Sequence, residues 1–164
     1  MKGELGISDN IFSIEEHNAI YTYCQDCHYT YGEKDDKDTP PSGMVHNIDP
    51  NKKIYQLFAD KIESEVYPDV KDMDLYRMYI NCFSPAENPM FHTDGDNGIT
   101  FLYYANTEEW SVDDGGETQF YMDGNITGVT PIPNRIAMFD ASIMHCAKSF
   151  RDRHRFTVAI KYAH

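Results

Sequence analysis

The stretch FHTDGDNGITFLYYAN, residues 91–106, carries the pattern that decides the fold. Side chains alternate along an extended chain, so His92 and Asp94 are expected to project to one side and Thr93 to the other. Asn97-Gly98 is a turn signal, and the segment after it has the length of a short strand. Short strands separated by such turns are expected from Asp74 onward.

His145 follows far downstream, in Ile143-Met144-His145. Two imidazoles and one carboxylate suit a first-row transition metal of intermediate softness, and a set supplied from one face leaves the opposite positions free for substrate or oxygen. His92, Asp94 and His145 are therefore the candidate metal ligands. Each of them alone has a simpler interpretation, because H-x-D occurs by chance and a lone histidine usually belongs to the core.

Arg155 comes ten residues after His145. Its side chain is always charged and forks toward carboxylates. Its neighbours Phe156 and Val158 are apolar and have the opposite strand parity, so Arg155 and Thr157 share the less apolar face. Arg155 is thus the candidate anion-binding residue.

In this order the motifs resemble the Fe(II)/2-oxoglutarate dioxygenase superfamily, which has an H-x-D, a distal His, and an Arg or Lys that binds the far carboxylate of 2-oxoglutarate. The resemblance is closest to the prolyl-4-hydroxylase-like branch and covers Asp74 to Tyr162. The other matching segments are Tyr103-Tyr104-Ala105-Asn106, with Ala105 where Leu is usual, Gly115-Gly116-Glu117-Thr118, and Pro133 to Asp140.

The resemblance implies roles for these residues. The three candidate ligands would hold Fe(II), and together with Arg155 they would form the catalytic set. Arg155 and the Tyr104 hydroxyl would bind the far carboxylate of 2-oxoglutarate, and Tyr79 would lie near its other end. Within this family, 2-oxoglutarate and O2 are consumed to give succinate and CO2 while an unactivated C–H is hydroxylated, and ascorbate restores oxidised iron.

The resemblance favours a prolyl residue in a peptide or protein as the substrate. A small molecule or free amino acid hydroxylated by the same chemistry stays open, and so does a non-catalytic metal-dependent jelly-roll binding protein. Cupin-type enzymes fit less well, because they usually present more histidines to the metal. The acidic residues Asp96, Asp113 and Asp114 would favour a neutral or basic substrate if they rim the mouth of the site.

The expected fold class is mainly β with flanking helices. One domain, residues 1–164, would contain a helical N-terminal support region, 1–72, and a jelly-roll catalytic core, 73–164. The core would be a double-stranded β-helix of about eight strands, with the N-terminal helices packed on one face.

Local signals predict the two helices. Ser13 and Glu16 form a capping box that opens a helix ending near Cys24, whose buried side would hold Ile14, Ala19, Ile20 and Tyr23. Asp49-Pro50 predicts the start of a second helix, which would end before Pro68. Between them, the polar segment Gly32 to Met44 is expected to form a mobile loop, either a lid or a substrate-edge loop.

The net charge is −13. Such a charge repels phosphate backbones, so nucleic acid is not an expected partner. The chain has no apolar run of membrane-spanning length and no signal-peptide pattern, so a cytoplasmic protein without membrane partners is expected. The oligomeric state does not follow from the sequence. Among the basic residues that crowd the end of the chain, only Arg155 is assigned a role; the others are Lys148, Arg151, Arg153 and Lys161.

Cys24-Gln25-Asp26-Cys27-His28 has the form of a haem-attachment motif, and with His46 it would also offer a zinc-like set. The haem interpretation is rejected, because covalent haem attachment belongs to exported proteins. A metal site is the less favoured interpretation, because the segment ends a predicted helix, and the sequence leaves open whether Cys24, Cys27 and His28 have a role. Cys82 and Cys146 are expected to be small buried residues.

Overall fold

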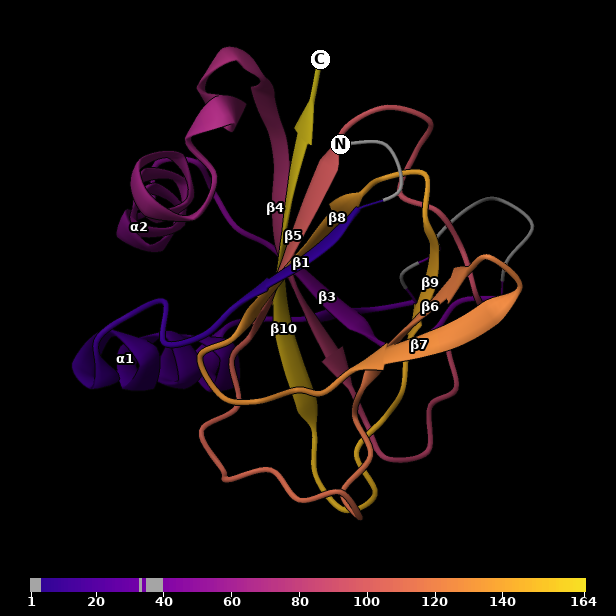
Figure 1. The fold of residues 1–164 in the computed structure, drawn as a ribbon. Coiled ribbons are helices and arrows are strands. Elements are labelled where there is room, and N and C mark those ends of the chain that lie inside the picture. Colours follow the sequence, from indigo (N-terminus) through magenta and orange to yellow (C-terminus); the bar gives the residue numbers. More distant parts are fainter. Residues whose placement is uncertain (1–3, 33, 35–39) are drawn as a thin grey trace.

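The computed structural model describes residues 4–32, 34 and 40–164. The described residues form two antiparallel sheets, one with the strand order β1-β8-β5-β10-β4-β3-β2 and one with the order β7-β6-β9. Figure 1 shows helices α1 and α2 on one side of the larger sheet and the smaller sheet on the other. The predicted mainly β class, a jelly roll with helices on one face, is confirmed. The strands are β1 Leu5–Ser8, β2 Thr30–Tyr31, β3 Met44–Asn47, β4 Asp74–Phe83, β5 Ile99–Tyr104, β6 Thr118–Met122, β7 Asn125–Val129, β8 Ile136–Asp140, β9 Met144–Ala147 and β10 Arg155–Ala163.

The larger sheet separates two hydrophobic clusters. Strand β5 shows how, since its alternating side chains divide between them: Phe101 and Tyr103 pack toward the helices, whereas Leu102 and Tyr104 pack between the sheets. Strand β5 is buried on both faces because it pairs with β8 and β10 in the middle of the sheet. The candidate site lies in the layer between the sheets.

Helix α1, Ile14–Asp26, begins with the predicted capping box, in which Ser13 and Glu16 each accept a backbone N–H of the other. Its buried side differs from the prediction. Ile14 is 64% exposed and Ala19 is exposed, whereas His17, Ile20 and Cys24 are buried. His17 takes a core position because its Nδ1 lies 2.5 Å from the Tyr103 hydroxyl.

Helix α2, Lys53–Lys61, starts later than predicted. The prediction that Asp49 caps it is wrong, because the Asp49 carboxylate instead accepts the Asn51 backbone N–H at 2.8 Å in a local turn. A π-helical turn, η1 Ile62–Val66, and a 3-10 turn, η2 Pro68–Asp72, complete the segment. Phe58 and Ile62, on the apolar side of this segment, are fully buried.

Three strands in the first 72 residues were not predicted. Strand β1 adds to β8 at one edge of the larger sheet, and β2 and β3 extend the other edge beyond β4.

The predicted division into a support region and a catalytic core at residue 73 stays a prediction. The predicted loop, Gly32 to Met44, includes residues 33 and 35–39, which lie outside the described residues, so its mobility stays a prediction. Among the helices of the described ranges, none has the length and apolar character needed to cross a membrane.

Candidate active site

The structure brings His92, Asp94 and His145 together between the sheets. His145 lies on β9, and the segment that holds His92 pairs beside it: each residue's backbone N–H donates to the other's carbonyl, at 3.0 and 2.8 Å. Asp94 is fixed by its own N–H, which donates to the Ala141 carbonyl at 2.8 Å. The predicted geometry, with both H-x-D side chains on one side, is therefore held by backbone bonds on two neighbouring segments.

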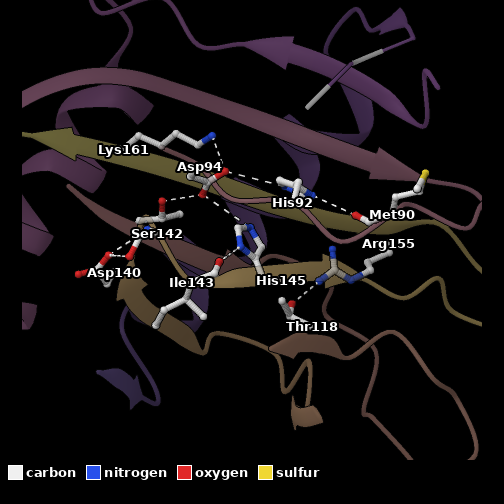
Figure 2. A network of polar contacts seen from close by, with 11 residues as sticks. Met90, His92, Asp94, Thr118, Asp140, Ser142, Ile143, His145, Arg155 and Lys161 are labelled. Atoms are coloured by element: carbon white, nitrogen blue, oxygen red, sulfur yellow. Dashed lines mark hydrogen bonds and ion pairs between the residues drawn. The ribbon is translucent and has the colours of Figure 1, made fainter. Parts of the chain in front are cut away.

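Each imidazole is oriented by a carbonyl oxygen two residues before it. The Nδ1 atoms lie 3.1 Å from the Met90 carbonyl for His92 and 2.9 Å from the Ile143 carbonyl for His145. If Nδ1 carries the proton in both rings, each Nε2 presents a lone pair, which is the arrangement that metal-binding histidines usually have. Figure 2 shows both rings turned toward Asp94.

The two Nε2 atoms lie close to the Asp94 carboxylate, at 3.9 Å for His92 and 3.6 Å for His145. Each oxygen of that carboxylate also accepts a hydrogen bond. The Thr100 hydroxyl donates to Oδ2 at 2.6 Å, and the Lys161 ammonium donates to Oδ1 at 2.8 Å. Asp94 is thus a nearly buried carboxylate held in one orientation from both sides.

The protonation states suit metal binding. Burial lowers the pKa of His145 to about 4, so the ring is neutral at pH 7. Burial alone would raise the pKa of the Asp94 carboxyl, but His145, Lys161 and the hydrogen bond from Thr100 bring it below its usual value. Both groups therefore present their lone pairs without first losing a proton.

One ligand atom from each of the three side chains lies within 4.8 Å of the others, and no second cluster of this kind occurs in the described ranges. Three donors of this type, drawn together on one side, fit the 2-His-1-carboxylate pattern typical of non-haem Fe(II). The donor set of this structure therefore fits the metal that the sequence predicts.

Arg155 lies at the other end of the same cavity and is 1% exposed. Its Nε donates to the Gly116 carbonyl and its Nη2 to the Thr118 hydroxyl, both at 2.8 Å. The hydrogen-bond partners found for Arg155 in the described structure are neutral oxygens, and burial lowers its pKa. A buried guanidinium with neutral partners attracts an anion, because its charge is not otherwise balanced.

The turn that precedes β6 explains this geometry. Gly116 has a φ of +82°, and a Cβ there would collide with the Phe150 ring. Only glycine therefore fits at this position, from which the backbone carbonyl accepts the hydrogen bond of Arg155. Two residues later, Thr118 accepts from Arg155 and also from the Tyr104 hydroxyl, at 2.8 Å. Thr118 was not predicted as a site residue, although the Gly-Gly-Glu-Thr motif that contains it was a signal.

The two predicted tyrosines are placed differently. Tyr104 is buried beside Arg155, whose guanidinium carbon lies 5.6 Å from its ring centre, but its hydroxyl reaches the cavity only through Thr118. Tyr79 lines the cavity directly, next to Asp94, and burial raises its pKa to about 12. The other residues that line the wall between the triad and Arg155 include Asn81, Leu102, Phe139, Ala147, Thr157 and Ala159.

The acidic residues expected near the mouth do not line this cavity. Asp114 instead pairs with Arg153 at 2.9 Å. Lys161, to which the sequence assigned no role, contacts the triad directly through Asp94 at 2.8 Å.

The cysteine segment forms no metal cluster within the described residues. Cys24 is buried, Cys27 is half-buried, and the Nδ1 of His46 is bound to the His28 carbonyl at 2.8 Å. Cys82 and Cys146 are buried, as predicted.

With the geometry in place, comparison with known proteins identifies the family. The 2OG-Fe(II) oxygenase superfamily matches residues 76–162, more than half of the chain, and this segment contains all three candidate ligands and Arg155. The chain belongs to the 2OG-Fe(II) oxygenase superfamily. A search of curated protein sequences gives no significant match.

Solved oxygenase structures share the fold at low sequence identity. A Pseudomonas putida prolyl-4-hydroxylase superimposes with a TM-score of 0.77 at 16% identity, covering 99% of this chain and 93% of that one. A prolyl hydroxylase from Trichoplax adhaerens, in complex with a hypoxia-inducible factor peptide, gives 0.80 at 14% identity, with coverages of 99% and 84%. HygX from Streptomyces hygroscopicus, with nickel and 2-oxoglutarate bound, gives 0.74 at 11% identity, with coverages of 97% and 82%. These neighbours establish the double-stranded β-helix.

Proposed function

We propose that the protein is an Fe(II)- and 2-oxoglutarate-dependent hydroxylase. The observation that carries this is one continuous cavity with the His92, Asp94 and His145 donors at one end and the buried Arg155 guanidinium at the other. A dicarboxylate of the length of 2-oxoglutarate, bound by Arg155 through one end, would direct its other end toward the metal.

The protein contributes mainly binding, orientation and exclusion of water. His92 and His145 would offer their Nε2 atoms to iron, and Asp94 would add the negative charge that Thr100 and Lys161 hold in place. When bound, iron supplies the oxygen activation needed to attack an unactivated C–H. The balanced reaction is R–H + O2 + 2-oxoglutarate → R–OH + succinate + CO2, so one oxygen atom enters the product and the other enters succinate. Ascorbate would serve as the reductant that restores oxidised iron.

A prolyl residue in a peptide is the first substrate to test, because two of the neighbours are named prolyl hydroxylases and one of these holds a peptide. Their identities of 16% and 14% support the fold alone, so a free amino acid or other small molecule belongs in the same experiment. The test is succinate formation from 2-oxoglutarate with Fe(II) under air, measured with proline peptides, free amino acids and oligonucleotides.

The expected result is that a peptide or amino acid stimulates succinate formation, that the hydroxylated product appears in a one-to-one ratio with succinate, and that oligonucleotides have no effect. Asp94→Asn should abolish turnover, because a neutral amide is a poor iron ligand. Metal and 2-oxoglutarate binding without any turnover across the panel would support the non-catalytic binding protein instead.

A further inference from the structure

Strand β10 carries two buried cations on the same side. Arg155 and Lys161 share strand parity, because the register of β10 shifts only after Lys161. Six residues at about 3.3 Å each separate their Cα atoms by roughly 20 Å. Figure 2 shows Lys161 beyond Asp94 at one end of the cluster and Arg155 beyond His92 and His145 at the other. Their charged groups are held at separate places, Lys161 by Asp94 and Arg155 by Gly116 and Thr118.

Lys161 is 8% exposed and lines a second hollow of about 60 Å³, which shares Tyr79, His92 and Asp94 with the first. Its other lining residues are Lys34, Arg77 and Thr93. Among the residues that the structure describes, three cations and a single carboxylate line this hollow, in a chain with a net charge of −13. An excess of positive side chains around a small hollow beside the candidate metal site, in an otherwise acidic protein, indicates that the hollow binds an anion.

Arg77 and Lys161 are positioned around Tyr79. The Arg77 guanidinium carbon lies 4.0 Å from the Tyr79 ring centre, and its Nε donates to Asn47 at 3.2 Å. The Lys161 ammonium lies 5.2 Å from the same ring centre. Lys161 also donates a hydrogen bond to Asp94 at 2.8 Å, so its ammonium is held between the Tyr79 ring and the Asp94 carboxylate.

The formal charges of the loaded site leave Lys161 unbalanced. The two charges of Fe(II) would be offset by Asp94 and one carboxylate of 2-oxoglutarate, and Arg155 by the other carboxylate. Lys161 would keep its hydrogen bond to Asp94 but no counter-charge of its own. A buried cation beside a divalent metal weakens metal binding by repulsion, unless a further anion lies nearby.

We propose that Lys161, together with Arg77, binds a carboxylate of the substrate. The substrate would then carry this group within a few atoms of the carbon that is hydroxylated, as an N-acylated amino acid does, or a peptide whose reacting residue adjoins an acidic one. The size of the hollow suits a carboxylate, because it has room for only a few water-sized groups. This inference rests on the proposed function and replaces the expectation of a neutral or basic substrate.

The test uses ligand pairs that differ in one charge: N-acetyl-L-proline with N-acetyl-L-prolinamide, and end-blocked Pro-Glu with Pro-Gln. Binding to protein loaded with Mn(II) and 2-oxoglutarate is measured by calorimetry without O2, so no turnover is needed. The carboxylate member of at least one pair should bind about tenfold more tightly than its amide. Lys161→Met should reduce this ratio to near one, and Lys161→Arg should retain it. Lys71→Met, at an exposed position, is the matched control and should leave it unchanged.

Three results would overturn the inference: no carboxylate member binding better than its amide, a preference that persists in Lys161→Met, or a loss of 2-oxoglutarate affinity in Lys161→Met as large as in an Arg155 variant. If Lys161→Met does not fold or bind metal, the charge pairs in wild-type protein and in Arg77→Met decide instead. Failure of the proposed function is distinguishable, because wild-type protein would then fail to bind 2-oxoglutarate in the presence of metal.

Discussion

Replacing Arg155 by methionine should weaken 2-oxoglutarate binding far more than metal binding. The guanidinium is 1% exposed, and its hydrogen bonds to Gly116 and Thr118 hold it in one orientation. Removing one partner of a buried, hydrogen-bonded charge pair costs about 2–5 kcal/mol. A loss of about 3 kcal/mol corresponds to a roughly 100-fold higher Kd, because 1.4 kcal/mol is about a factor of ten.

The assay is calorimetric titration of 2-oxoglutarate into protein loaded with Mn(II), with a separate titration of Mn(II) alone. A methionine side chain nearly fills the space of the arginine, but the Gly116 carbonyl and the Thr118 hydroxyl each lose a hydrogen-bond partner. The free energy of unfolding of the variant should therefore fall by about 1–3 kcal/mol. The titrations are done well below the unfolding temperature of the variant. Arg151→Met, at an exposed position near the start of β10, is the matched control. A 2-oxoglutarate Kd within about threefold of wild type in Arg155→Met, with metal bound, would refute the role assigned to Arg155.

Three further predictions concern neighbouring groups. Thr118→Val removes the hydroxyl that Arg155 and Tyr104 share, and should raise the 2-oxoglutarate Kd by about tenfold, which calorimetry would measure; an unchanged Kd would contradict it. His145→Ala should raise the Mn(II) Kd by more than about 100-fold while circular dichroism still shows a folded protein, and comparable metal affinity would exclude His145 as a ligand. In the folded, metal-free protein the pKa of His145 is about 4, whereas in the unfolded chain it is the ordinary 6.5. Between pH 4 and pH 6.5 the unfolded state therefore binds more protons than the folded state. The free energy of unfolding should therefore fall by up to about 3 kcal/mol as the pH drops from 6.5 to 4, and urea titrations should show a smaller fall in His145→Gln.

The candidate ligands could be predicted from sequence because local chemistry and spacing agree. His92 and Asp94 are two residues apart on an extended segment, and the histidine that completes the set precedes a strand with an arginine of matching parity. The residues that tune the site could not be predicted in this way. Lys161 looks like a solvated lysine near the chain end, and its partner Asp94 lies 67 residues earlier. Thr118 joins the site only because the glycine turn before it brings its hydroxyl within hydrogen-bond distance of Arg155.

Errors in the N-terminal region have a related cause. Asp49-Pro50 has the residues of a helix start, but the Asp49 side chain makes an equally local bond to Asn51, and the helix begins later. Strands β1 and β3 have four residues each, too few to show a period, and they form because β8 and β4 offer them an edge. Tertiary pairing, which no short window of sequence contains, decides whether these strands form.

The most direct test of the account is a crystal structure of the protein with Mn(II) and 2-oxoglutarate, grown without O2. The account predicts one metal ion bound by the Nε2 atoms of His92 and His145 and by Asp94, with one carboxylate of 2-oxoglutarate on Arg155 and Thr118. A metal bound elsewhere, or a 2-oxoglutarate whose carboxylates both lie away from Arg155, would contradict it.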